Sequence, residues 1–206
     1  MLHYYRGAVQ EAVAYYQGAL AIAKRLGDSH NIAIAALNLG RANVELECHE
    51  VARPLLDEAL RRFRQLGRRQ SEVVALLALA WLDDVTGLDT SAEALMQEAG
   101  AAAAELRTPP VLVLLNLVVG ERHRRQGRIQ DAADTYREAL QHASIANMPL
   151  EQAVAHRVLG DCLKAQGQLD AAKEHWRKAL SFYEPLGAVY ASKLQRLLSS
   201  ADGLRA

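Results

Sequence analysis

The residues of this sequence that are best suited to metal binding or nucleophilic chemistry are its seven histidines and two cysteines. Imidazole and thiolate groups do such chemistry when several of them converge at one place. The histidines are scattered along the chain without ligand spacing, and the nearest approach to a metal pair is Cys48-His49. Adjacent residues rarely converge on one ion, so we interpret this pair as part of a turn and predict no metal site.

Motifs of catalysis and nucleotide binding are missing from the sequence. It contains no G-x-x-x-x-G-K-[ST], no G-x-G-x-x-G, no H-E-x-x-H and no paired C-x-x-C. Acidic residues are plentiful, but no two of them are singled out by a local apolar pocket that would tune them as acid and base. We therefore predict that the protein is not an enzyme and needs no cofactor.

Small and large residues recur at a fixed interval of 40, and we call each such set of positions a column. The first alanine column is Ala12, Ala52, Ala92, Ala132 and Ala172, the second is Ala19, Ala59, Ala99, Ala139 and Ala179, and the column between them is Tyr16, Leu56, Met96, Tyr136 and Trp176. Repeats of this length cannot bury their apolar faces alone, so they stack on their neighbours. The period therefore predicts a solenoid.

Each repeat has the pattern of two helices. Apolar residues recur at helical spacing over 30–46 and again over 50–66, with a break between the two stretches. We predict such breaks near residues 7, 47, 87, 127 and 167. A further column consists of Gly27, Gly67, Asn147 and Gly187, and these residue types suit a left-handed residue that closes a helix. Arg107 interrupts this column, and we expect Pro109-Pro110 to end that helix instead.

Three glycines lie inside the predicted first helices, at Gly40, Gly120 and Gly160, and Ala80 completes their column. Glycine inside a helix costs about 1 kcal/mol relative to alanine. A packing gain must offset this cost, and we expect a helix backbone to pass close to each glycine.

The columns resemble the tetratricopeptide repeat family. The best match is Leu159-Gly160, Gly167, Ala172, Trp176 and Ala179-Leu180, and the same pattern recurs around Gly120 and Gly40. The resemblance covers almost the whole chain and implies an all-α, right-handed superhelix of antiparallel helix pairs. The period of 40 exceeds the family's usual 34 and falls in the range of HEAT-type repeats, which is the structural alternative. The long units are similar to arrays in large bacterial signalling ATPases and transcriptional regulators.

We predict one solenoid domain over residues 1–206 with five units and a terminal cap. The units are about 1–29 (partial), 30–69, 70–109, 110–149 and 150–187, and the capping helix is 188–200. The second helix of the third unit, 91–106, is mostly alanine. This feature fits either a flexible point or sequence drift. The first unit lacks most of its first helix, so we expect an open apolar edge there and either a longer protein or self-association through that edge.

In the tetratricopeptide repeat fold, the first helix of each unit lines a concave groove. The resemblance assigns to this groove Leu37, Arg41, Val44, Leu77, Trp81, Asp84, Leu117, Glu121, Arg124, Arg157, Asp161 and Lys164. Trp81 stands in a column that is otherwise polar, so it could anchor a partner or pack on a neighbouring helix. The groove lacks the Lys/Asn pattern with which chaperone-binding members of the family hold a peptide carboxylate.

Two arginine clusters raise the alternative of nucleic-acid binding. They are Arg61, Arg62, Arg64, Arg68 and Arg69, and Arg122, Arg124, Arg125 and Arg128. In a stack of antiparallel helices the two clusters fall on opposite edges, whereas nucleic acid needs a continuous basic stripe. The 24 basic and 24 acidic residues also cancel. We interpret the clusters as solvated faces with local ion pairs.

The expected location is the cytoplasm. Cys48 and Cys162 are three repeats apart and cannot form a disulfide, which fits a reducing compartment. The N-terminus has no secretion signal, and the longest apolar run, 73–82, is far shorter than the ~20 residues that span a bilayer.

These observations favour a non-enzymatic module that binds a protein or peptide, as the sensor or interaction region of a larger bacterial regulatory protein. A free-standing scaffold that assembles protein complexes is the alternative, and a nucleic-acid-associated adaptor that uses the arginine clusters is the third candidate.

Overall fold

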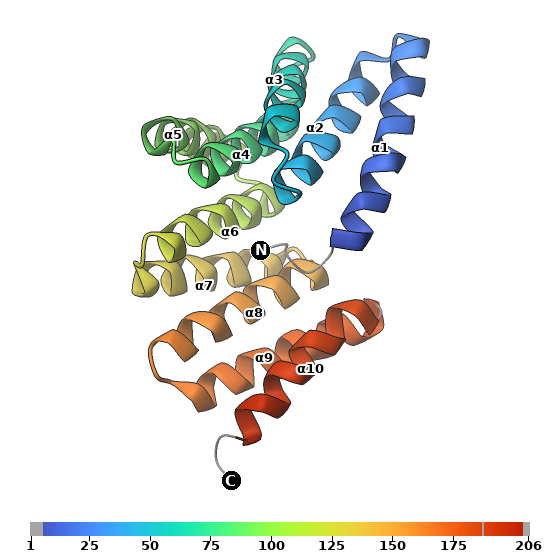
Figure 1. The fold of residues 1–206 in the computed structure, drawn as a ribbon. Helices are drawn as coiled ribbons and strands as arrows, with labels where there is room; N and C mark the ends of the chain where they lie inside the picture. Colours follow the sequence, from blue (N-terminus) through green and yellow to red (C-terminus); the bar gives the residue numbers. More distant parts are fainter. Residues whose placement is uncertain (1–5, 187, 204–206) are drawn as a thin grey trace. The chain divides into compact units, whose positions relative to one another are not determined.

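The computed structural model describes residues 6–186 and 188–203, and in these residues the chain forms α-helices and one 3₁₀ turn, with no strand (Figure 1). The α-helices are α1 (Arg6–Leu26), α2 (Ser29–Glu45), α3 (His49–Gln65), α4 (Arg69–Val85), α5 (Asp89–Leu106), α6 (Pro109–Arg125), α7 (Ile129–Ile145), α8 (Pro149–Ala165), α9 (Leu169–Tyr183) and α10 (Ala188–Gly203). The predicted all-α class is confirmed.

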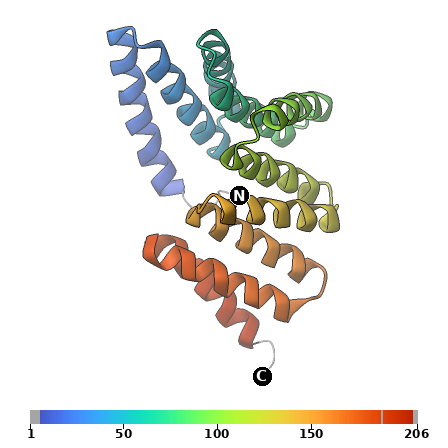
Figure 2. The same ribbon diagram turned by 180° about the vertical axis from the view of Figure 1, so that it is seen from behind.

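Consecutive helices pack as antiparallel pairs, of which α2–α3, α4–α5, α6–α7 and α8–α9 correspond to the predicted repeats (Figure 2). The breaks predicted near residues 47, 87, 127 and 167 are confirmed, since each lies in a turn of three residues between two helices. Gly7 was expected at a break but is the second residue of α1, and any turn before Arg6 lies outside the described residues.

Each of the turns from residue 27 to residue 167 contains one residue with positive φ. The residue is glycine at most turns, but Glu47 has φ 63°, Arg107 has φ 49° and Asn147 has φ 50°. Arg107 therefore does not interrupt the column, as the sequence suggested, because it takes the same left-handed conformation as the glycines and closes α5. An L-residue is strained in this region, and the packing of the helices on both sides must offset the strain.

The chain divides into two compact units, residues 1–107 and 108–206. The first contains α1 to α5 and the second contains α6 to α10. One continuous domain over residues 1–206 stays a prediction.

The alanine columns form the contact between paired helices. From the second repeat onwards all eight alanines of the two columns are fully buried, and so are Leu56, Tyr136 and Trp176 between them. Met96 is 9% exposed. In α1 the equivalent residues Ala12 and Ala19 are only half-buried, since α1 packs on α2 alone within its unit. Small residues thus admit the neighbouring helix, and the large residue fills the space between them.

The glycines inside the first helices face the large residue of the paired helix. A Cβ atom on Gly120 would lie 2.6 Å from Cε1 of Tyr136, and one on Gly40 would lie 2.6 Å from Cδ2 of Leu56. We expected a helix backbone at this place. The backbone is near, but the main obstacle is the large side chain, which lies directly over the glycine. The glycine and the large residue are therefore one packing unit.

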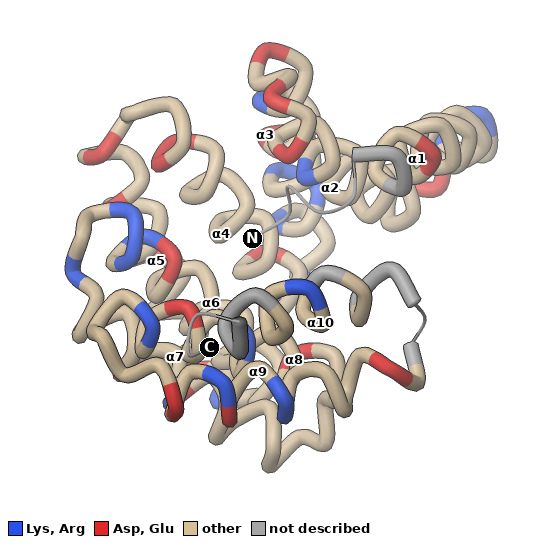
Figure 3. The backbone as a smooth tube through the Cα atoms, turned by 60° about the horizontal axis from the view of Figure 1, so that its bottom comes forward, with Lys and Arg blue, Asp and Glu red and all other residues tan. Residues whose placement is uncertain are grey.

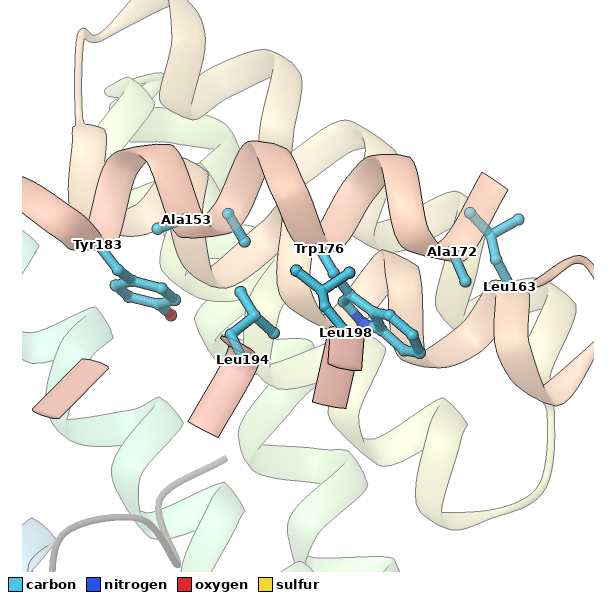
Figure 4. Packing of buried hydrophobic residues seen from close by; sticks show 8 residues of the cluster. Ala153, Leu163, Ala172, Trp176, Tyr183, Leu194 and Leu198 are labelled. Carbon is cyan, nitrogen blue, oxygen red and sulfur yellow. The ribbon is translucent and has the colours of Figure 1, made fainter. Parts of the chain in front are cut away.

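The last helix closes the second unit. Leu194 and Leu198 of α10 are buried and join Trp176 and Tyr183 of α9 in one apolar cluster, as Figure 4 shows. The helix predicted over 188–200 is confirmed, and α10 buries one face against α9. The side chains of Val189 and Tyr190 in this helix lie outside the described residues.

None of the helices in the described residues is long and apolar enough to cross a bilayer.

Candidate functional site

In the first unit the predicted groove residues separate into buried and exposed sets. Leu37, Val44 and Leu77 are 7%, 3% and 1% exposed, so they are packing residues and offer almost no surface to a partner. The assignment of a groove to this side of α2 and α4 stays a prediction, and within it these three residues would contribute little surface. Arg41 and Asp84 remain partly exposed.

Trp81 is the largest residue of the predicted set that keeps part of its surface open. It lies on α4, one turn after the fully buried Leu77. Its position in the column belongs to Arg41, Glu121 and Asp161 in the other repeats, all of which are partly exposed. A tryptophan in a polar column presents a large apolar area and one N–H donor, a combination that is common at binding sites.

In the second unit the two acidic residues of this column, Glu121 and Asp161, accept hydrogen bonds from buried aromatic residues of the paired helices. The Tyr136 hydroxyl donates to Oε2 of Glu121 over 3.1 Å, and Trp176 Nε1 donates to Oδ1 of Asp161 over 3.1 Å. Both aromatic residues are fully buried, so the carboxylates satisfy polar atoms that would otherwise be stranded. Glu121 and Asp161 are therefore largely structural.

Basic residues lie beside these carboxylates. Arg124 donates twice to Glu121, from Nε over 2.9 Å and from Nη2 over 2.6 Å, and Arg157 donates to Asp161 over 3.1 Å. Burial raises the pKa of Asp161, and Arg157 opposes this effect. Burial acts to raise the pKa of Glu121 too, but the hydrogen bonds from Arg124 outweigh it and the pKa is lowered.

Lys164 extends the basic face of α8. Its Nζ lies 5.9 Å from the centre of the Trp176 ring, within the range of a cation–π contact, and the residue is exposed. Leu117, in contrast, is 5% exposed and belongs to the core, so it offers little surface to a partner. The second unit thus presents a polar face on α6 and α8. Arg124 is more exposed than Glu121 on this face, whereas Asp161 is more exposed than Arg157.

We did not predict from the sequence that the acidic residue of a first helix accepts a hydrogen bond from the aromatic residue of the paired second helix. The members of each pair are 15 residues apart, so Glu121 matches Tyr136 and Asp161 matches Trp176. In the other two repeats the same offset joins Arg41 to Leu56 and Trp81 to Met96, in which the buried member has no polar tip. An acid on the first helix thus occurs only in the two repeats whose buried large residue has a polar tip. This covariation between repeats could have revealed the pairing from the sequence.

The arginine clusters form local ion pairs, as predicted. Arg62 pairs with Glu58, Arg64 with Glu72 and Glu98, and Arg69 with Glu72 and Glu105. Figure 3 shows acidic and basic residues interspersed along the individual helices. These arginines are largely neutralised by protein carboxylates and form no continuous basic stripe along the helices of their unit.

Two histidines that are 19 residues apart in sequence meet in the second unit. His156 Nδ1 and His175 Nδ1 are 3.0 Å apart, and the His156 ring stacks on Phe182 with 6.2 Å between ring centres. The sequence had suggested scattered histidines. The described residues contain no group of three possible metal ligands, so the pair is best explained as a hydrogen bond between neutral rings, one donating and one accepting.

This pair predicts a loss of stability in acid. Burial lowers the pKa of His156 to about 4, with help from His175 and Lys178 and against Glu174. Burial also lowers the pKa of His175, Lys178 and Arg137 add to this, and Glu174 opposes it. Since the fold favours the neutral rings, their stabilisation is complete above the unfolded pKa of about 6.5 and is lost as the pH falls towards 4. After allowance for solvent screening, we expect about 1–2 kcal/mol.

Chemical denaturation at pH 7 and pH 4.5 checks this prediction against the variant His156→Gln. The wild type should lose about 1–2 kcal/mol more than the variant between the two pH values. An equal acid-induced loss in both proteins would show that carboxylates alone cause it.

Comparison with known proteins agrees with this architecture. A family model described as "Tetratricopeptide repeat" matches residues 1–65 and 111–184. The unmatched stretch holds α4 and the alanine-rich α5, which nevertheless pack as a pair like the others. The solved structure of BtubC (BKLC) from P. vanneervenii has the same fold, with a TM-score of 0.70 at 18% identity, over 94% of this chain and 83% of that one.

Among curated proteins, the chain is similar to "Regulatory protein AfsR" of Streptomyces griseus. The two are 28% identical in an alignment of 229 positions, which covers 97% of this chain and 24% of the relative. The chain thus spans about a quarter of the length of that relative. Because the family model matches well over half of the residues, the chain belongs to the tetratricopeptide repeat family.

Proposed function

We propose that this chain is a non-enzymatic module that binds a protein or peptide segment, and that it forms the sensor or interaction region of a larger bacterial regulatory protein. Membership of a family of protein-interaction repeats supports the first part. The second part rests on the similarity to a regulatory protein about four times as long.

Trp81 carries the proposal for the binding surface. It is a partly exposed tryptophan on a first helix, at a position where the other repeats have charged residues. Residues of this type dominate binding energies at protein interfaces, because they combine a large apolar area with a hydrogen-bond donor. We place the partner contact of the first unit on the exposed faces of α2 and α4, with Arg41 and Asp84 beside Trp81.

The second unit offers a different chemistry on α6 and α8. Glu121 and Asp161 are held by Tyr136 and Trp176. On this face the three cations Arg124, Arg157 and Lys164 outnumber the two acids. A partner that meets this face is better matched if it carries acidic groups. Lys164 and Arg124 are exposed, whereas Arg157 is only partly exposed.

The cytoplasm is the compartment that suits this proposal. Both cysteines are free, Cys48 at the surface and Cys162 buried. Burial raises the pKa of the Cys162 thiol to about 11, so it is an unreactive packing residue.

Site-specific photo-cross-linking in the source bacterium tests the proposal. A photoreactive residue at Arg41 or Lys164, on first helices, should trap one defined polypeptide. The same residue at the exposed positions Gln97 and Arg177, on second helices, serves as the matched control and should trap little. Equal trapping from both sets, or none from the first helices, would contradict the assigned surface.

A further inference from the structure

The outer side of α1 carries an exposed apolar stripe. Tyr15, Ile22 and Leu26 are 75%, 52% and 72% exposed, and their spacing of seven and four residues places them on one face of the helix. The half-buried Ala12 and Ala19 lie on the same face. Three large exposed apolar residues on one helix face mark an interaction site, whereas single ones are ordinary.

The repeat register shows what kind of neighbour this face accepts. In α3 the equivalent of Ala12 is Ala52, which is fully buried where Leu56 lies over Gly40 of α2. Helix α2 instead covers the other edge of α1, where Leu20 and Ala23 are buried. The open face of α1 is thus built to take a helix at close range.

We propose that this helix is α1 of a second copy of the chain, in antiparallel orientation. The charged residues of α1 are Arg6, Glu11, Lys24 and Arg25, so its last turn is basic and its only acid lies in the N-terminal half. An antiparallel pair brings Glu11 of each copy to the basic end of the other, whereas a parallel pair would set like charges side by side.

The small residues fix the register of this pair. Gly18 has no atom within 4 Å of a Cβ built on it, and Ala19 follows it in the middle of α1. If the two helices cross at these residues, where their backbones can approach most closely, Tyr15 of one copy lies over Ile22 of the other. The same crossing puts Glu11 next to Arg25 of the second copy. The apolar stripe and the charge pair are then satisfied together, twice by symmetry.

Light scattering of the full chain over a range of concentrations tests the proposal. The wild type should pass from monomer to dimer, and Tyr15→Glu and Ile22→Glu should each remain monomeric. Ile145→Glu, at a residue that is 68% exposed on α7, is the matched control and should dimerise like the wild type. Circular dichroism should show unchanged helix content in all variants.

A charge exchange tests the orientation. Glu11→Lys alone and Arg25→Glu alone should each weaken the dimer about tenfold, and the double variant should recover most of the loss. A wild-type monomer at every concentration would overturn the proposal and assign this face to another occupant. A dimer that survives Tyr15→Glu, or a double variant weaker than both single ones, would also overturn it.

Discussion

Replacing Gly160 with alanine is expected to lower the free energy of unfolding by about 2 kcal/mol. The new Cβ would overlap Cδ1 and Nε1 of the Trp176 indole and lie 3.0 Å from the carbonyl oxygen of Ala172. Neither neighbour can move freely, because Trp176 is fully buried and donates to Asp161, and Ala172 belongs to the backbone of α9. Overpacking of this kind typically costs about 1–3 kcal/mol, which exceeds the gain in helix propensity.

Gly100→Ala is the matched control and should change stability in the opposite direction. This glycine also lies inside a helix, α5, but a Cβ on it meets nothing within 4 Å. Alanine should therefore stabilise the helix by up to about 1 kcal/mol. Urea denaturation followed by circular dichroism compares both variants with the wild type. If Gly160→Ala were neutral or stabilising, the glycine would not be required by the large residue opposite.

A second substitution separates overpacking from other causes. The third repeat combines Ala80 with Met96, a flexible side chain at the position of Trp176. In the background Trp176→Met, the change Gly160→Ala should therefore cost at least about 1 kcal/mol less than in the wild type. Equal costs in both backgrounds would contradict the pairing of glycine with the large residue.

The sequence was sufficient to predict the fold because its period is imposed by packing. From the second repeat onwards each unit buries two alanines and a large residue between them, so Ala132, Tyr136 and Ala139 recur in register with their equivalents. The turns could be placed for the same reason. Arg107 was misjudged because residue type alone suggested a break in the column, whereas the tertiary fold holds it in the left-handed conformation.

The candidate site was harder to predict. A repeat pattern shows that Leu37, Leu77 and Leu117 occupy one column, but their exposure depends on which helices cover that column in three dimensions. Polar contacts between the two helices that flank a turn were difficult to predict for the same reason. His156 and His175 come from facing helices, and nothing in either helix alone indicates that their rings meet.

Trp81→Ala is expected to weaken partner binding by about 2 kcal/mol or more, roughly 30-fold, and to leave the stability of the fold nearly unchanged. The reason is that the exposed part of the indole is available to a partner, while the core beneath it is formed by Leu77 and Leu82, which are each 1% exposed. The partner identified by cross-linking is the ligand for this measurement.

Leu77→Ala is the control from the same helix. Since Leu77 is buried, its truncation should cost about 2–5 kcal/mol of unfolding free energy and should leave the affinity of the folded molecules unchanged.

The central claim is that the exposed faces of the first helices bind the partner. The most direct test is to measure binding isotherms of the wild type, Trp81→Ala and Leu77→Ala, each corrected for the folded fraction. The account predicts a dissociation constant about 30-fold higher for Trp81→Ala and the wild-type value for Leu77→Ala. Wild-type affinity for Trp81→Ala, together with a collapse of its thermal stability, would show that Trp81 is a core residue and would contradict the claim.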